Sequence, residues 1–244
     1  IKTEPFMDET MLGVFGQGTF LRYMVGMIES LGHSPVIMES SNGFESGPGV
    51  IICDRVFVTK KLLNDFLKSI DKNRVNMLGV VRNVASSYNL PVMDAEINRL
   101  QDGGEGIFYS CFFHPDCSKL KGIRIEEAEI ILKSQAVRHI TKTREINMDM
   151  KLPSIREKQY LLKFPITSSV AAHITHWVHI LRLNHLAFGI LWLEYIYSNI
   201  GSTAAMVLKS LRNGIPSSHH EILKGMNIIG KGAEVHKSAY VESS

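Results

Sequence analysis

Cysteine is scarce in this chain, and its few occurrences argue against a disulfide scaffold. The 244 residues contain three cysteines, Cys53, Cys111 and Cys117, which cannot all pair within the chain. Cys53 lies in an apolar stretch typical of a buried strand, which favours reduced thiols and a cytoplasmic setting. Cys111 and Cys117 could pair or bind a metal, but no second cysteine cluster supports a zinc site.

The sequence also lacks a long apolar run and a strong charge of either sign. The longest apolar stretch, residues 186–200, contains Glu194 and is too short to cross a bilayer. The formal net charge of +3 is too small to imply nucleic acid by itself. With 45% hydrophobic and 21% charged residues the composition is that of an ordinary soluble protein. We therefore expect neither a membrane nor a nucleic acid as partner.

The clearest structural signal lies in residues 49–70, GVIICDRVFVTKKLLNDFLKSI. Residues 50–53 are apolar and largely β-branched, which predicts a buried strand that ends at Asp54. Thr59 is placed to cap a helix with an apolar stripe made of Leu62, Leu63, Phe66, Leu67 and Ile70. Ligands of open α/β sheets bind outside the carboxyl ends of strands, so Asp54 is a candidate site residue. The alternative is an Asp that only forms turn hydrogen bonds.

Further elements alternate along the chain and predict an α/β fold. Helical spacing occurs in residues 16–32, 168–197 and 203–213. Strands are predicted over residues 35–40, 76–82, 106–113 and 122–133, and a basic edge strand over residues 135–146.

One row of residues in the long predicted helix has a regular spacing of three: His173, His176, His179, Arg182 and His185. Neighbouring members would face the same side of a helix. The row could bind an anion such as phosphate through Arg182 and protonated imidazoles, or a transition metal through two imidazoles. It could equally be packing where the helix meets another domain or subunit.

A short glycine pattern precedes the first predicted helix. Gly16, Gly18 and Thr19 stand before it, and Arg22 lies one turn inside it. Backbone amides of such a turn can hold a phosphate. The pattern lacks the Lys-Ser/Thr pair of a P-loop and the third glycine of a dinucleotide fold. A flexible entry to the helix explains the same residues.

The last residues show a period of six. Ile229, Val235 and Val241 are six apart, as are Ala233 and Ala239. This spacing resembles the hexapeptide repeat of left-handed parallel β-helices, in which each coil packs one small aliphatic residue inward per face. Because a solenoid needs several coils to bury a core, we expect residues 228–244 to be only its start. The resemblance implies a homo-oligomer assembled through the β-helix.

An α/β domain followed by such a solenoid resembles the sugar-phosphate nucleotidyltransferases. In that family a GxGTRL loop wraps the nucleotide phosphates, and an Asp at the end of a central strand holds the catalytic magnesium. The resemblance implies that Asp54 is catalytic and binds Mg²⁺. Residues 16–22 match the loop in part, with Phe20 in place of its Arg. The family's second metal-binding Asp has only loose candidates.

These observations together predict an α/β, Rossmann-like nucleotidyltransferase sheet over residues 1–165, a helical linker over residues 166–227, and the first coils of a left-handed parallel β-helix. The expected activity joins a nucleoside triphosphate to a sugar 1-phosphate. Asp54 would hold Mg²⁺, while Gly16, Gly18, Thr19, Arg22 and the row from His173 to Arg182 would hold phosphates. Two alternatives are a catalytically degenerate domain that binds a sugar nucleotide or regulates a partner, and a scaffold for a hexapeptide-repeat acyltransferase.

Overall fold

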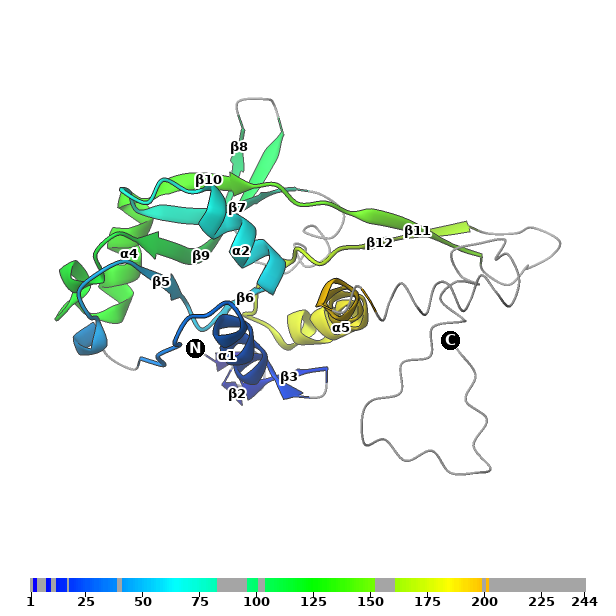
Figure 1. Ribbon diagram of the computed structural model, residues 1–244, viewed down its shortest axis with the longest axis horizontal. Coiled ribbons are helices and arrows are strands. Elements are labelled where there is room, and N and C mark those ends of the chain that lie inside the picture. Colours follow the sequence, from blue (N-terminus) through cyan, green and yellow to red (C-terminus); the bar gives the residue numbers. More distant parts are fainter. Residues whose placement is uncertain are drawn as a thin grey trace. The chain divides into compact units, whose positions relative to one another are not determined.

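The computed structural model describes residues 2–3, 8–9, 12–16, 18–38, 41–82, 96–100, 104–151, 161–198 and 201 (Figure 1). The chain divides into two compact units. The first consists of Ile1–Glu145 and Ile166–Leu191, and the second of Ile146–Pro165 and Trp192–Ser244. The predicted helix over residues 203–213 and the predicted β-helix coils over residues 228–244 lie outside the described residues.

The first unit contains a five-stranded mixed sheet. Its strands are β5 (Gly49–Ile52), β7 (Asn76–Val81), β8 (Glu96–Arg99), β9 (Glu105–His114) and β10 (Val137–Thr141). The order is β10-β7-β9-β5, and β8 also pairs with β9. β10 is parallel to β7, whereas β9 is antiparallel to β5, β7 and β8. The α/β class is therefore confirmed, and β5 lies at an edge of this sheet, although the resemblance implies a central strand there.

Four helices of five or more residues occur in the described part: α1 (Phe20–Ser30), α2 (Lys60–Ser69), α4 (Ile125–Gln135) and α5 (Trp177–Ser198). Shorter 3₁₀ turns cover Ser41–Gly43 and Cys117–Leu120. None of these described helices combines the length and the apolar character needed to cross a membrane.

Helix α4 replaces a predicted strand and covers one face of the sheet. The prediction of a strand over residues 122–133 was wrong, because Ala128 and Leu132 are four apart and share one helical face. That face packs into a core with Met77 of β7 and with Phe108 and Phe112 of β9. The helix therefore places its polar residues close to the same face of β9.

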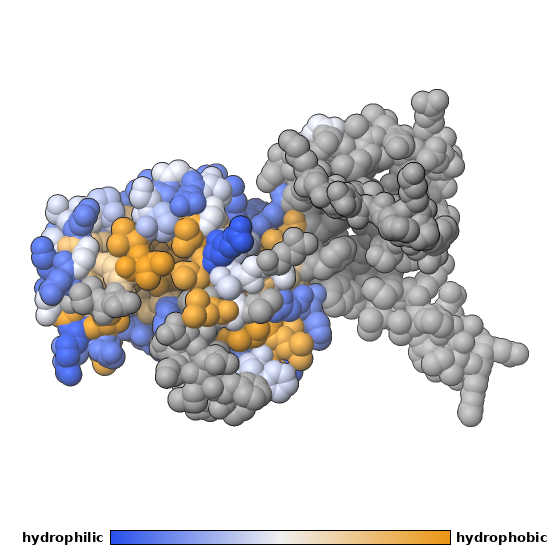
Figure 2. All heavy atoms as spheres, turned by 90° about the horizontal axis from the view of Figure 1, so that it is seen from below, coloured by the Kyte–Doolittle hydropathy of each residue, from blue (hydrophilic) through white to orange (hydrophobic). Residues whose placement is uncertain are grey.

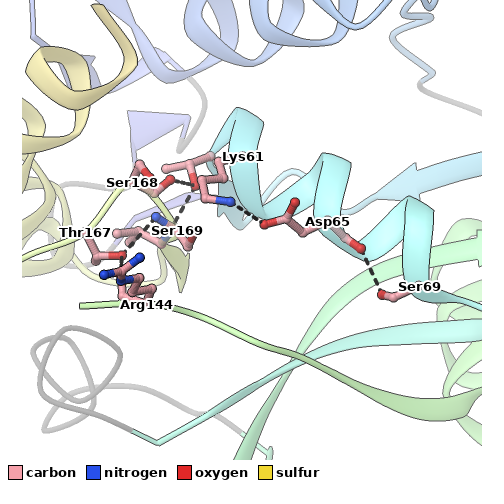
Figure 3. Close-up of polar contacts among 9 residues, drawn as sticks. Lys61, Asp65, Ser69, Arg144, Thr167, Ser168 and Ser169 are labelled. Atoms are coloured by element: carbon pink, nitrogen blue, oxygen red, sulfur yellow. Dashed lines mark hydrogen bonds and ion pairs between the residues drawn. The ribbon is translucent and has the colours of Figure 1, made fainter. Parts of the chain in front are cut away.

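Thr59 directly precedes helix α2, as predicted, but its hydroxyl does not cap the helix. The buried Thr59 Oγ1 donates to the Ser168 carbonyl (2.7 Å) and accepts from the Val170 N–H (3.0 Å). The Thr167 hydroxyl in turn donates to the Arg144 carbonyl (2.8 Å), as Figure 3 shows. These bonds tie two distant stretches of the chain to the start of α2.

The predicted helix over residues 168–197 begins late. β13 (Ala171–His173) pairs antiparallel with β6 (Val56–Val58), and α5 starts only at Trp177. Of the strand predicted over residues 35–40, residues 35–38 are described and form neither helix nor strand. The other predicted strands of the sheet correspond to β5, β7, β9 and β10, and β10 lies at the sheet edge as predicted.

Three further strand pairs complete the described part. β1 (Lys2–Thr3) pairs with β2 (Asp8–Glu9), β3 (Val14–Phe15) with β4 (Gly18–Thr19), and β11 (Ile146–Lys151) with β12 (Leu161–Ile166). The rings of Phe15, Phe20, Tyr23 and Phe57 pack with centroids 4.9–5.6 Å apart, which joins β3 and α1 to β6.

The surface view of Figure 2 shows apolar side chains interspersed with hydrophilic ones over the described part of one face. The most exposed large apolar side chains of the described residues include Val36, Ile37 and Ile130. Scattered apolar exposure is normal for a folded protein and by itself indicates no binding site.

Candidate functional site

The chain turns sharply where β5 leaves the sheet, and this turn carries the predicted catalytic residue. β5 ends at Ile52, and Cys53, Asp54 and Arg55 lead into β6. The Asp54 side chain is exposed. β5, β7 and β10 run in the same direction, but β5 ends opposite Cys111 of β9 whereas β7 ends opposite Gly106, so this turn lies at the carboxyl end of β5 and beside the middle of β9.

Four polar side chains from three separate elements meet beside this turn. Arg55 Nη2 forms an ion pair with Glu129 Oε1 of α4 and lies 3.4 Å from Ser110 Oγ of β9. The Ser110 hydroxyl donates to the same Glu129 oxygen (2.8 Å), and Lys133 Nζ also lies 2.8 Å from it. One carboxylate oxygen therefore holds two cations and a hydroxyl. We call Arg55, Ser110, Glu129 and Lys133 the Glu129 cluster.

The electrostatics of the Glu129 cluster favour an ionised carboxylate. Burial alone would raise the pKa of Glu129, but hydrogen bonds from Lys133 and Ser110 and the charge of Arg55 outweigh burial and lower this pKa. Burial, with a further contribution from the Glu129 charge, raises the pKa of the Cys53 thiol to about 12. Asp54 also raises the Cys53 pKa, so its carboxylate acts on the same small region.

His173 is the one member of the predicted histidine row that lies in this region. Its Nε2 accepts the backbone N–H of Ser110 (3.3 Å), and its ring packs against Tyr109 at 5.3 Å. β5 pairs with β9 from Cys111 to His114, and β8 pairs with β9 from Glu105 to Phe108. The imidazole thus provides an acceptor at the gap between the two strands.

The other row members lie on or just before α5, where two of them cap the helix. His176 Nδ1 accepts the Val178 N–H (3.2 Å), and the buried His179 Nδ1 accepts the N–H groups of Thr175 (3.1 Å) and His176 (3.2 Å). This arrangement resembles a capping box made of imidazoles. Arg182 and His185 follow on the next turn of α5. The row is therefore not one continuous helical face.

The glycine pattern forms a tight hairpin between β3 and β4. Gly16 has φ of 58° at its turn, and its N–H donates to Asn184 Oδ1 of α5 (3.0 Å). Gly18 pairs with Phe15 in the hairpin, while Thr19 Oγ1 caps α1 by accepting the Arg22 N–H (3.2 Å). The structure thus brings the glycine turn to α5, which carries His179 and Arg182, rather than to the turn at Asp54.

Asp54 is the residue predicted to hold a metal ion. No group of three or more His, Cys, Asp or Glu side chains suited to a metal occurs among the described residues. Mg²⁺ commonly keeps several waters and is held by one or two carboxylates together with substrate phosphates. An exposed carboxylate such as Asp54 fits that mode of binding.

Sequence reasoning missed Arg55, Ser110, Glu129 and Lys133 as candidate site residues. One signal was available, because Glu129 and Lys133 are four apart in the order that stabilises a helix. Ser110 is an ordinary strand residue in the sequence, and only the packing of α4 on β9 reveals its role. Comparison of the chain with protein-family models, curated proteins and solved structures returned no match.

Proposed function

We propose that this chain is a nucleotidyltransferase-like domain that joins a nucleoside triphosphate to a sugar 1-phosphate at the turn after β5. The observation that carries the proposal is the exposed Asp54 at the carboxyl end of β5, next to Arg55 of the Glu129 cluster. A carboxylate for a cation and guanidinium groups for phosphate are the two components that phosphoryl-type transfer needs.

The proposed chemistry is an in-line displacement at the α-phosphate. The sugar phosphate attacks, and pyrophosphate leaves with the electrons of the bond that breaks. Mg²⁺ on Asp54 would supply charge neutralisation at the phosphates. Asp54 would hold the cation at the end of β5, and Arg55 would orient a phosphate beside it. Both act through position and charge, because this reaction asks little covalent chemistry of the protein.

A pyrophosphate-release assay tests this proposal. The chain is incubated with Mg²⁺, each of the four common nucleoside triphosphates and a panel of sugar 1-phosphates. We expect release with at least one pair and a loss of at least about a hundredfold in Asp54→Asn. Asp65→Asn on α2 is the matched control, because among the described residues Asp65 forms its ion pair with Lys61 of the same helix. No release with any pair, or full activity of Asp54→Asn, overturns the proposal.

The second candidate is a catalytically degenerate domain that binds a sugar nucleotide. The glycine hairpin favours it, because the Gly16 N–H is bonded to Asn184 and Thr19 already caps α1. Calorimetry with UDP-sugars in EDTA distinguishes the two candidates. Binding without metal and without turnover supports the binder, whereas binding that requires Mg²⁺ supports the enzyme.

A further inference from the structure

We infer that Arg55 and Lys133, anchored on Glu129, form a subsite for a phosphate or diphosphate group. The inference rests on the proposed function for the identity of the natural ligand, because it assigns the place of that ligand's phosphates. The subsite itself is defined by contacts that need neither Asp54 nor a metal ion.

The hydrogen bonds of Arg55 leave most of its guanidinium available. Both side-chain contacts use Nη2, to Glu129 and to Ser110. Within the described residues, Nη1 and Nε have no protein acceptor, and the Arg55 side chain is 24% exposed. A planar guanidinium held at one nitrogen can present its other N–H groups to two oxygens of a phosphate.

Lys133 supplies a second cation at the same place. Its Nζ contacts the same Glu129 oxygen as Arg55, and its side chain is 38% exposed. Within the described part of the chain, this one contact leaves two of its three N–H donors available. Arg55 and Lys133 are therefore neighbours with further donors on partly exposed side chains.

Cation donors outnumber carboxylates within the Glu129 cluster. Two cations share the single Glu129 carboxylate, and the Asp54 carboxylate beside Arg55 offsets the remaining positive charge. The Glu129 carboxylate is 16% exposed and ionised, and it keeps both cations in place. Ser110 fixes the carboxylate from β9. The Glu129–Lys133 pair also stabilises α4 as a pair four residues apart, and the subsite uses the donors that this pair leaves available.

The test is titration of the full chain with sodium pyrophosphate in EDTA at about 0.15 M salt, which screens weak surface attraction. We expect saturable binding by isothermal calorimetry. Arg55→Gln should weaken it at least about tenfold, since a lost charged hydrogen bond is worth that much, and Lys133→Gln should weaken it by a smaller factor. The double variant Arg55→Gln/Glu129→Gln removes both charges of the Arg55–Glu129 ion pair, and it should bind pyrophosphate as weakly as Arg55→Gln if that variant weakens binding by losing the Arg55 donors rather than by misfolding.

Two cations outside the cluster serve as matched controls. Arg124 directly precedes α4, and Arg124→Gln removes an exposed Arg paired with Glu127. Lys61→Gln removes an exposed Lys with the same four-residue spacing to its carboxylate, Asp65. Binding should be unchanged in both. Equal weakening in controls and cluster variants, or no saturable binding in the folded chain, overturns the subsite.

The outcomes for the subsite and for nucleotidyl transfer are separable. Asp54→Asn should abolish pyrophosphate release from triphosphates without weakening pyrophosphate binding in EDTA. If the chain shows no turnover but Arg55→Gln abolishes binding, the enzymatic proposal fails and the subsite stands. If Asp54 is needed for turnover but both cluster variants bind pyrophosphate normally, the subsite is wrong and the enzymatic proposal stands.

Discussion

The backbone N–H of Ser110 donates to Nε2 of His173 across 63 positions of sequence, at 3.3 Å. The bond lies where neither β5 nor β8 pairs with β9. Opposite this point the β7 ladder is also irregular, because the register shifts between Met77 and Gly79. The Ser110 side chain holds Glu129 from the same place. Where the ladder of β9 is interrupted, the His173 imidazole thus accepts the Ser110 N–H, and the Ser110 side chain supports the Glu129 cluster.

Loss of the imidazole acceptor should weaken this region measurably. We expect His173→Phe to destabilise the protein by about 1–3 kcal/mol, because it leaves the buried Ser110 N–H without an acceptor. His173→Gln, which keeps an acceptor, should cost less. Urea unfolding gives the free energies, and hydrogen exchange at the Ser110 amide gives the local effect. Unchanged protection of that amide in His173→Phe would show that the bond is not needed.

The lowered pKa of Glu129 predicts a stability contribution that depends on pH. A carboxyl group with a lower pKa in the folded state stabilises the protein above its ordinary pKa of about 4.3. That contribution is lost as the pH falls through the lower folded value. Glu129→Gln should therefore cost about 1–3 kcal/mol at pH 7, and the difference from wild type should shrink toward pH 3. Urea midpoints measured from pH 7 to pH 3 test this, and a constant difference contradicts it.

The surroundings of Gly79 in β7 and Gly26 in α1 predict opposite changes in stability when each glycine is replaced by alanine. A Cβ at Gly79 would lie 2.6 Å from Phe108 Cε1 and 3.0 Å from Ile140 Cδ1. Gly79→Ala should destabilise the protein by about 1–3 kcal/mol through overpacking. Gly26 is exposed in α1 with nothing within 4 Å of an added Cβ, so Gly26→Ala should stabilise by up to about 1 kcal/mol. Urea unfolding gives the free energy of unfolding of both variants. A change of the same sign in both would contradict the described surroundings of the two glycines.

The three thiols should react slowly in the folded protein. Burial raises the pKa of Cys53 to about 12 and raises the pKa values of Cys111 and Cys117 as well. At pH 8 the thiolate fraction of Cys53 is then about 10⁻⁴, so alkylation by iodoacetamide should be about a thousandfold slower than for free cysteine. Mass spectrometry counts the labels, with guanidine-unfolded protein as the fully labelled control. Rapid labelling of native Cys53 would contradict the assigned burial.

The candidate site was predictable in part. Asp54 could be placed at a strand end because an apolar run followed by an amphipathic helix specifies its local structure. The Glu129 cluster was not predictable, because the pattern of residues 122–133 favours a strand where the structure has α4. Glu129 and Lys133 of α4 also come close to β9 and to the β5–β6 turn only through packing. The histidine spacing was misleading for a similar reason. His173 pairs with β6 as part of a strand, and this tertiary contact overrides the helical period.

Local patterns of apolar residues are sufficient to specify the elements with strong periods: β5, α2, β7, β9 and the larger part of α5. Periodicity is sufficient there because each element buries one face or is buried throughout. Packing between elements, by contrast, places β5 at an edge and β9 antiparallel between β5 and β7. It also brings together Arg55, Ser110, Glu129 and Lys133. Strand order and ion pairs depend on which faces pack together, and no local pattern of residues encodes that choice.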